Sequence, residues 1–481
     1  MSETLSRRAL ARRLLVRPAP VALPTPQPDA AHHLASRATF GADAATVGEI
    51  RQLGIAGWLR RQLAPDSIDD SAAETLVAAE IAPYLAVAAD VRLLLRALWS
   101  KRQLQWRMVH FLNNHFATYR GTTAGISETK EDDAFAATCF GAFASVLRTS
   151  ATSPAMIDFL DLRSNIAASP NENYARELLE LHTLGVGSGY SEADIVEVAR
   201  VFTGWTRTNV RTAQGQPITD SYFRFARGRH DSGAKTVSLG WSTPGISGAN
   251  GWFEGLAFLD FLAAHPSTAD RFTQKLCRYF VADAPPRGLL ARVRQVFVSS
   301  GGHLARTLET MFLDPEFYDP QHVRTKVHDG FEFAVNILRR FELSAARGRA
   351  VNNEVGLLGS QPHQNPVPTG YPEVAAAWQS AGHLLPRWNF VENLLQNRIA
   401  QTRIDWQAMF PVRPRTAAAW VHPLLDRLLD DAVPASTTTA LIAFFANRLT
   451  GLPANPSWAQ LLPHLRALAT LILQLPEAQL H

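Results

Sequence analysis

The chain has 481 residues, of which 46% are hydrophobic and 19% charged, and its formal net charge is +4. This composition is typical of a folded globular protein, and the length suits two or three ordinary domains or one large helical domain. No window reaches the roughly 18 apolar residues that a membrane-spanning helix needs, so we expect no transmembrane segment. Because there is no basic block beyond the N-terminus, no zinc-finger pattern and no P-loop, the sequence also predicts no nucleic-acid partner.

The first 28 residues are basic and rich in proline. The run SRRAL near their start is similar to a twin-arginine export signal. Such a signal continues with an apolar stretch of about 7 to 15 residues, whereas here Arg12, Arg13, Arg17 and several prolines interrupt it. We therefore expect residues 1–28 to be a disordered tail, and we favour a cytoplasmic location over a periplasmic or envelope-associated one.

Apolar residues recur with a helical period from His32 onward. We expect helices within residues 73–119, 131–149, 154–161, 251–283, 287–313, 324–343 and 372–382, and through the C-terminal third. The period changes between residues 220 and 240, where SYFRFA and KTVSL are typical of two short strands of one hairpin. The predicted fold is mostly α. It is a large multi-helix domain over residues 29–345 with a small β-hairpin insertion near 220–240, followed by a helical region, 346–481, packed on the same core.

Two capping signals stand close together between these elements. Ser169 and Glu172 have the spacing of a capping box, which predicts that a helix covering residues 170–186 begins here. Ser191 and Asp194 have the same spacing and predict the start of the next helix. We therefore expect a helix–turn–helix corner.

The helix at 170–186 carries an unusual set of polar residues. Glu177 and Glu180 are neighbours at helical spacing, and Glu172, Arg176 and Glu180 form a ladder at four-residue steps. His182 lies on the apolar side, where an imidazole needs a partner. Two interpretations stay open: an ion-paired surface with one core histidine, or a functional site.

A second polar group lies in HFLNNHFATYR, residues 110–120. His110 and Asn114 are four residues apart, whereas His115 lies about 140° around the helix from His110. The two histidines therefore cannot hold one ion from a single straight helix, and either one faces a pocket or both are ordinary helix residues.

Two further groups contain residues that could carry chemistry. His230 and Asp231, near Lys235, suit a metal ligand, a general base or simple turn chemistry. PTGYP contains Tyr371 in a tight turn, and RWNF places Trp388 beside Asn389, which together offer a flat apolar face with an amide. Such aromatic residues serve either as a ligand platform or as core.

A series of longer runs occurs in order along the chain: NNHFAT, NENYARELLELHTLGVGSGYSEADIVEVARVFTGW, RHDSGAKTVSLG, AAHPSTADRFTQKLCRYFV, SSGGHLARTLETMFLDPEF, PTGYPEVAAAW and LLPRWNF. With the opening HHLASRATFGADAATVGEIRQLGIAGWLRRQL, the series resembles the bacterial family known as domain of unknown function 1800, over about residues 30–400. The resemblance implies a large bacterial protein, often exported and often encoded beside a second uncharacterised family related to sulfatases and alkaline phosphatases. The interrupted apolar stretch at the N-terminus departs from that pattern. The resemblance assigns no active site, but the matching positions are Asn114, His115, Asn171, Glu172, Asn173, Tyr174, Arg176, Glu177, Glu180, His182, Trp205, His230, Asp231, Lys235 and Lys326.

These groups lead to the hypothesis of a hydrolytic enzyme whose pocket is built by the segments 110–119, 170–186 and 225–240. The predicted metal ligands are His115, Glu177, His230 and Asp231, a set that suits a divalent Zn, Fe, Mn or Mg ion able to activate water. The predicted catalytic residues are Glu177, Glu180, His182 and Lys235, and the predicted substrate-binding residues are Asn114, Tyr174, Arg176, Tyr371, Trp388 and Asn389. Without a metal, Glu177 and Glu180 would form an acid/base pair, because neighbouring carboxylates push their pKa values apart.

The alternative is a non-enzymatic helical scaffold or accessory partner of a sulfatase- or phosphatase-like protein. Under this hypothesis the signature residues are buried and bonded to one another. A third interpretation, association of the basic tail with a membrane surface or polysaccharide, rests on the tail arginines alone. A pocket lined by His115, Glu177 and His230 would favour the enzyme, and a dry ion-pair network would favour the scaffold.

Overall fold

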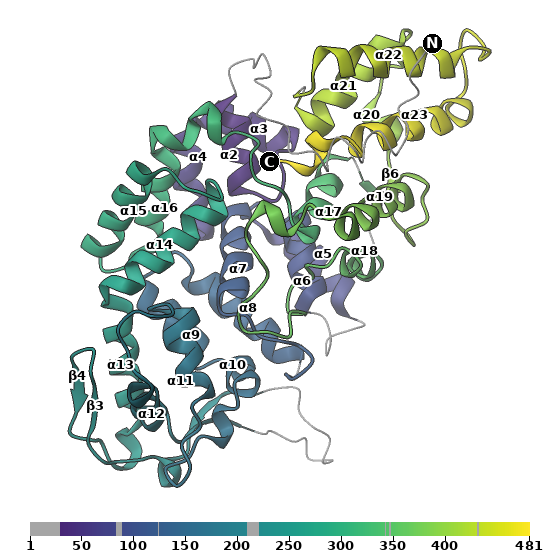
Figure 1. Cartoon of the computed structure of the whole chain (residues 1–481). Helices are drawn as coiled ribbons and strands as arrows, with labels where there is room; N and C mark the ends of the chain where they lie inside the picture. The colour runs from purple at the N-terminus through teal and green to yellow at the C-terminus, as the bar shows by residue number, and fades with distance from the viewer. Residues whose placement is uncertain are drawn as a thin grey trace, which may run out of the picture. The chain divides into compact units, whose positions relative to one another are not determined.

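The computed structural model describes residues 29–82, 89–123, 125–208, 221–341, 343–345, 348–430 and 432–481 (Figure 1). Helices dominate these residues, and the strands form only two-stranded sheets, so the expected mostly α fold is confirmed. The expected tail, residues 1–28, lies outside the described residues. Among the helices in the described ranges, none combines the length and hydropathy of a transmembrane span.

The chain divides into two compact units whose segments alternate along the sequence. Among the described residues, unit 1 comprises 29–58, 318–361 and 373–481, and unit 2 comprises 59–317 and 362–372. The expected regions were consecutive instead, with a boundary near residue 345. The difference arises because both 29–58 and 318–345 belong with the C-terminal helices.

Unit 2 is built from helices that pack mainly on their neighbours in sequence. They are α5 (Ser71–Ile81), α6 (Ala89–Trp99), α7 (Gln103–His115), α8 (Gly125–Thr138), α9 (Phe143–Ala151), α10 (Pro154–Phe159), α11 (Asn173–Glu177), α12 (Glu192–Val201), α13 (Trp252–Ala264), α14 (Pro266–Phe280), α15 (Arg287–Ser299) and α16 (Leu304–Leu313), while α4 (Ile55–Gln62) crosses the unit boundary. Helices α14, α15 and α16 lie side by side (Figure 1). The apolar stretch 251–283 is divided at Pro266, because proline is favoured in the first turn of a helix and not in its interior.

Unit 1 combines its N-terminal helices with the C-terminal part of the chain. Its elements are α2 (Ala30–Ala38), α3 (Ala44–Leu53), α17 (Gly330–Arg340), β5 (Leu343–Ala345), α18 (Gly348–Gly356), α19 (Ala381–Leu395), β6 (Arg403–Ile404), α20 (Trp406–Met409), α21 (Ala417–Leu429), α22 (Ala435–Leu449) and α23 (Trp458–Leu473). Helices α21, α22 and α23 pack on one another (Figure 1). Residues 375–377 form a single 3-10 turn where a helix over 372–382 was expected.

Both strands expected near 220–240 exist, but their expected pairing with each other is wrong. Strand β2 (Phe223–Phe225) pairs with β1 (Trp205–Arg207), and β3 (Lys235–Val237) pairs with β4 (Trp241–Thr243). The ring of Phe223 meets buried Trp205 at 4.9 Å, which favours the first pairing. Gly240, at φ 94°, allows the tight turn that closes the second as a hairpin.

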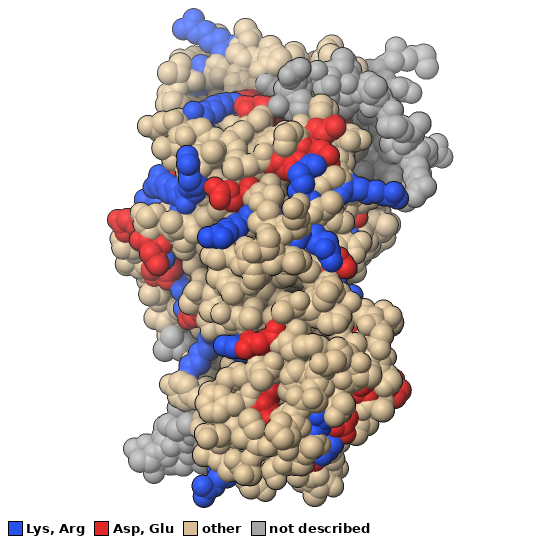
Figure 2. Space-filling model, turned by 90° about the vertical axis from the view of Figure 1, so that its left-hand side faces the viewer, with Lys and Arg blue, Asp and Glu red and all other residues tan. Residues whose placement is uncertain are grey.

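Charged side chains of both signs are interspersed on the face of the molecule that Figure 2 shows. Basic and acidic residues alternate there between broad areas of other residues. This described surface therefore does not present the continuous basic stripe that marks a nucleic-acid-binding face.

Candidate functional site

The polar helix expected at 170–186 is shorter and less regular than its sequence suggests. It begins at Asn173, not after Ser169, so the expected capping box of Ser169 with Glu172 is wrong. Ser169 instead forms a β-bridge with Ile166, and the side chain of Asn171 accepts the N–H of Asn173 at 2.9 Å. The loop therefore provides its own turn before the helix starts. The second signal is confirmed, because Ser191 and Asp194 form a complete capping box at α12.

At its C-terminal end this helix widens into a π-helical turn, Leu178–His182. The hydroxyl of Thr183 donates to the carbonyl of Leu178 at 2.6 Å, and the N–H of Gly185 donates to the carbonyl of Leu179 at 3.0 Å. π-helical turns are rare in proteins, and those that do occur are often found at functional sites. Regular helical spacing no longer holds beyond Leu178, so the orientation expected for Glu180 and His182 from a straight helix does not apply.

Glu177 directly precedes this turn and Glu180 lies within it, and both side chains are partly exposed. Burial, followed by the negative charge of Glu180, raises the pKa of Glu177, while Arg176 opposes the shift. Nη1 of Arg176 lies 3.7 Å from Oε1 of Glu180. The two carboxylates therefore differ in surroundings, as an acid/base pair requires.

The expected ladder along this helix exists, but its strongest contact is one that the sequence did not indicate. Arg176 lies 3.3 Å from Glu172 and only 2.7 Å from Glu192 of α12. Arg176, expected to bind substrate, thus links two helices.

Two further residues border the π-helical turn and were also missed. Burial and then the negative charge of Glu180 raise the pKa of Tyr190. Nε of Arg271 donates to the carbonyl of Leu181 at 3.1 Å.

His115 and His182 come together, 67 residues apart in sequence, in an aromatic core. Their ring centroids are 6.3 Å apart, and Nε2 of His115 donates to the carbonyl of His182 at 3.1 Å. Both side chains are 1% exposed. Burial, with the nearby charges of Lys275 and Arg271, lowers the pKa of His182 to about 3 and that of His115 well below its ordinary value. Both imidazoles are therefore neutral and shielded from solvent.

Tyr174, which was expected to bind substrate, also lies in the core. Its ring packs edge-on against that of Phe202, with the ring centroids 5.1 Å apart.

His230 and Lys235 belong to a separate buried network centred on Glu254, a residue that the sequence did not single out. Oε2 of Glu254 lies 2.7 Å from Nζ of Lys235 and 3.4 Å from Nε2 of His230. Nδ1 of His230 donates to the carbonyl of Thr203 at 2.9 Å. Lys235 and Glu254 satisfy each other, which is the behaviour of a structural brace, whereas Nε2 of His230 makes no hydrogen bond with the described residues.

Asp231 is held by a different partner. Nε of Arg200 lies 2.7 Å from its carboxylate, and this hydrogen bond, opposed by partial burial, is the main cause of the lowered pKa of Asp231. His115 thus meets His182 and Glu177 neighbours Glu180, whereas His230 and Asp231 contact Glu254 and Arg200, so a common centre of all six residues stays a prediction.

The expected metal ligands do not converge. One group of three histidine and acidic residues in the described part of the chain has ligand atoms within 4.8 Å of one another: His328, Glu332 and His481 of unit 1. The expected set of His115, Glu177, His230 and Asp231 does not form such a group. The reason is that His230 and Asp231 are drawn to Glu254 and Arg200.

Asn114 and Tyr371 are adjacent, as two members of one site would be, but the hydrogen bonds between them join the side chain of Asn114 to the backbone of Tyr371. The Asn114 amide donates to the carbonyl of Tyr371 at 2.9 Å and accepts its N–H at 2.6 Å. A Cβ on Gly370 would lie 2.2 Å from the carbonyl oxygen of Asn114. The amide therefore fixes the 362–372 loop on the end of α7.

A buried acidic cluster lies beside this loop and gave no signal in the sequence. His363 Nε2 is 3.3 Å from Asp132, and its Nδ1 is 3.5 Å from Glu128. Burial alone would lower the pKa of His363, but Asp132 and then Glu128 raise it to about 10. Burial and the charge of Glu128 raise the pKa of Glu131 to about 8. The imidazolium of His363 thus neutralises part of the negative charge of this buried group of carboxylates.

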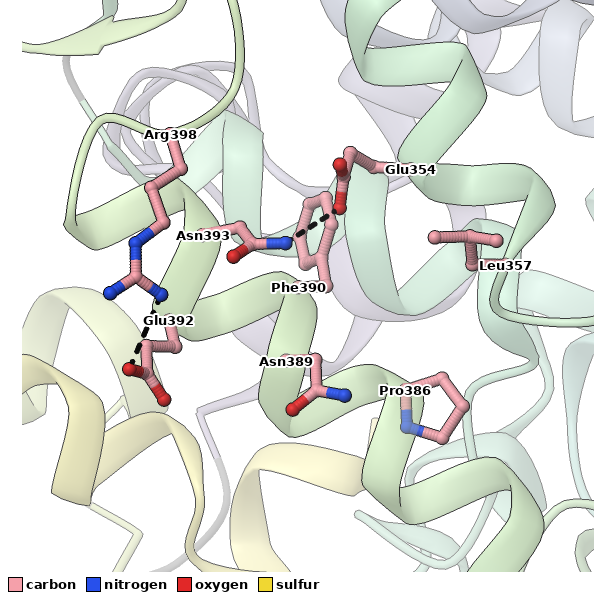
Figure 3. Close-up of a pocket in the computed structure, with 8 residues that line it drawn as sticks. All are labelled: Glu354, Leu357, Pro386, Asn389, Phe390, Glu392, Asn393 and Arg398. Carbon is pink, nitrogen blue, oxygen red and sulfur yellow. Dashed lines mark hydrogen bonds and ion pairs between the residues drawn. The ribbon is translucent and has the colours of Figure 1, made fainter.

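The remaining expected residues lie in unit 1, on α19. Asn389 lines a pocket of about 480 Å³, together with Glu354, Leu357, Pro386, Phe390, Glu392, Asn393 and Arg398 (Figure 3). Glu354 accepts a hydrogen bond from Asn393 at 3.1 Å across the pocket. Trp388, by contrast, is 8% exposed and belongs to the core, which is one of the two interpretations that the sequence left open for this residue. Successive residues of a helix point in different directions, which separates the two.

Comparison with known families decides what the chain is related to. A family model described as "Protein of unknown function (DUF1800)" matches residues 33–480. The chain belongs to this family. No curated protein and no solved structure gives a significant match. The expected resemblance is thereby confirmed over nearly the whole chain, and the DUF1800 family itself carries no assigned reaction.

Proposed function

We propose that this DUF1800 protein is a hydrolase-type enzyme in which Glu177 and Glu180 act as a general acid/base pair at the π-helical turn. The observation that carries the proposal is that these two carboxylates are the partly exposed members of the expected catalytic set, whereas His182 and Lys235 are buried. Hydrolysis needs a group that gives a proton and a group that activates water.

The two roles follow from the surroundings of each carboxylate. Glu177, with its raised pKa, is the group suited to hold and donate a proton. Glu180 is ion-paired with Arg176 and is the candidate base. Tyr190 and Arg271 border the same turn and would offer a hydroxyl and a positive charge to a polar or anionic substrate.

A second candidate function is favoured by the buried networks. The buried contact of Lys235 with Glu254, which His230 also faces, is the kind of internal brace expected for a scaffold or accessory partner of a sulfatase- or phosphatase-like protein. This candidate assigns Glu177 and Glu180 no chemical role, so the two functions differ in a measurable way.

The test is hydrolysis of p-nitrophenyl acetate, phosphate and sulfate by the purified full chain. We expect turnover of at least one probe, reduced on the order of 100-fold in Glu177→Gln and in Glu180→Gln, because acid or base catalysis contributes about that much. Glu309→Gln on α16 is the matched control and should retain the wild-type rate. Equal rates in all four proteins, or no turnover of any probe, would reject the enzyme and favour the scaffold.

A further inference from the structure

Three potential metal ligands meet in unit 1, whereas the proposed acid/base pair belongs to unit 2. They are His328, Glu332 and His481, and one nitrogen or oxygen atom from each lies within 4.8 Å of the other two. Oε2 of Glu332 is 3.9 Å from Nδ1 of His328 and 3.8 Å from Nε2 of His481. All three side chains are less than 10% exposed.

Backbone pairing brings these residues together from distant parts of the sequence. Val327 and Leu480 form an antiparallel bridge, flanked by hydrogen bonds from His328 N–H to the carbonyl of Gln479 at 2.9 Å and from His481 N–H to the carbonyl of Lys326 at 3.0 Å. The two imidazole rings consequently stack at 4.1 Å. Glu332 reaches the same point from the first turn of α17, which Asp329 caps.

The outer contacts of the cluster orient its nitrogen atoms. Nδ1 of His481 lies 3.2 Å from the carbonyl oxygen of Ser36. A carbonyl only accepts, so Nδ1 carries the ring proton, and Nε2 of the neutral ring presents its lone pair toward Glu332. A histidine that ligates a metal typically donates its other N–H in this way. On His328 the side-chain nitrogen of Asn336 lies 3.3 Å from Nε2, and the side-chain oxygen of Asn336 accepts from Arg340. In the metal-free ring Nε2 therefore accepts and Nδ1, which faces Glu332, carries the proton. Metal binding at Nδ1 requires the Asn336 amide to turn, so that Nε2–H donates to its oxygen.

A further buried side chain, that of Arg387, secures the frame around the cluster. Arg387 donates to the carbonyl of His328 at 2.6 Å and to the side chain of Gln479 at 2.8 Å. It therefore holds the two segments that carry the histidines at a fixed separation. A ligand set on such a rigid frame loses little conformational freedom when an ion binds.

We propose that His328, Glu332 and His481 bind a divalent transition-metal ion, for which zinc is the best suited, and that this ion fastens residues 479–481 to residues 326–332. Two imidazoles and one carboxylate are an established zinc ligand set, and the same donors accept other borderline divalent ions. With bonds of about 2.1 Å, tetrahedral ligands are about 3.4 Å apart, so closing the present distances needs side-chain shifts of roughly half an ångström. Burial of all three donors favours a structural ion over a catalytic one.

The test is a zinc titration of the full chain after removal of metal with a chelator. We expect one equivalent to bind and to raise the melting temperature, because a ligand that binds only the folded state stabilises it. Glu332→Gln keeps the size of the side chain and should weaken zinc binding at least 100-fold, as should His481→Ala. His422→Ala, an exposed histidine of α21, is the matched control and should bind zinc like the wild type.

The outcomes separate a built site from surface binding. Binding of one equivalent that is lost in both cluster variants and kept in His422→Ala supports the proposal. No stoichiometric zinc in the wild type, or equal affinity in wild type and Glu332→Gln, overturns it. If Glu332→Gln loses its helical circular dichroism, the wild-type stoichiometry and the visible absorption of bound Co²⁺, which reports histidine ligation, decide the question instead. Neither result depends on the hydrolysis measurements.

Discussion

Nζ of Lys235 lies 2.7 Å from Oε2 of Glu254, and neither side chain is exposed to solvent. Removing one partner of such a pair leaves a buried charge without compensation, which typically costs about 3–5 kcal/mol. We therefore expect Lys235→Met to lower the urea midpoint of unfolding clearly. Arg294→Met, which breaks the partly exposed pair with Asp270, should leave the midpoint nearly unchanged. Equal shifts in the two variants would show that the Lys235–Glu254 pair does not brace unit 2.

The buried His182 predicts a specific loss of stability in acid. Its pKa is about 3 in the folded chain and about 6.5 when unfolded, so the unfolded state takes up the proton first. The stability that this shift confers is complete above pH 6.5 and is lost as the pH falls toward 3, by up to about 1.4 kcal/mol per pH unit. We expect His182→Leu to show a shallower decline of the unfolding midpoint between pH 6 and 4. Parallel curves for the variant and the wild type would contradict the burial of this histidine.

His363 should behave in the opposite sense. Its folded pKa, about 10, lies above the unfolded value, so its contribution is complete below pH 6.5 and is lost as the pH rises through 10. We expect His363→Gln to be destabilised most near pH 6, with the difference from wild type narrowing toward pH 10. Thermal unfolding at several pH values measures this difference. A difference that widens with pH would rule out the ion pairs with Asp132 and Glu128.

Gly370 tests the clamp between Asn114 and the 362–372 loop. Gly370→Ala would place a Cβ 2.2 Å from the carbonyl oxygen of Asn114, in addition to the strain of a φ of 73°. Gly187→Ala has nearly the same φ, 75°, but no atom within 4 Å, so it isolates the backbone strain of about 1–2 kcal/mol. We expect Gly370→Ala to lower the melting temperature more than Gly187→Ala and to make the loop more sensitive to protease. Identical behaviour of the two alanine variants would exclude close packing at Asn114.

The features that the sequence predicted well are local ones. Apolar periodicity predicted most of the helices, and the Ser191–Asp194 capping box predicted the start of α12, because both signals depend on residues a few positions apart. The π-helical turn was missed, since it depends on side-chain and backbone hydrogen bonds of Thr183 and Gly185. The zinc candidate was missed because His481 meets His328 only through pairing of distant segments.

The candidate site shows the same limit. Glu177 and Glu180 are neighbours as predicted, although the helix is not regular there, and the meeting of His115 with His182 was also expected. Glu254 lies 24 residues from His230 and carries no motif, so nothing in the sequence revealed that it would draw His230 and Lys235 into a buried network. Long-range partners of this kind decide whether a polar residue faces a pocket or the core.

The most direct test of the acid/base proposal is the pH dependence of hydrolysis by the wild type and by Glu177→Gln, with the best of the three p-nitrophenyl probes. Because the pKa of Glu177 is raised above its ordinary value, we expect the wild-type rate to fall on the alkaline side of a pKa above 4.5, as this residue loses the proton that it donates. The variant should lack that limb and react at a low rate that does not vary with pH in this range. A wild-type profile without such a limb, or a variant profile that follows the wild type, would contradict the role of Glu177.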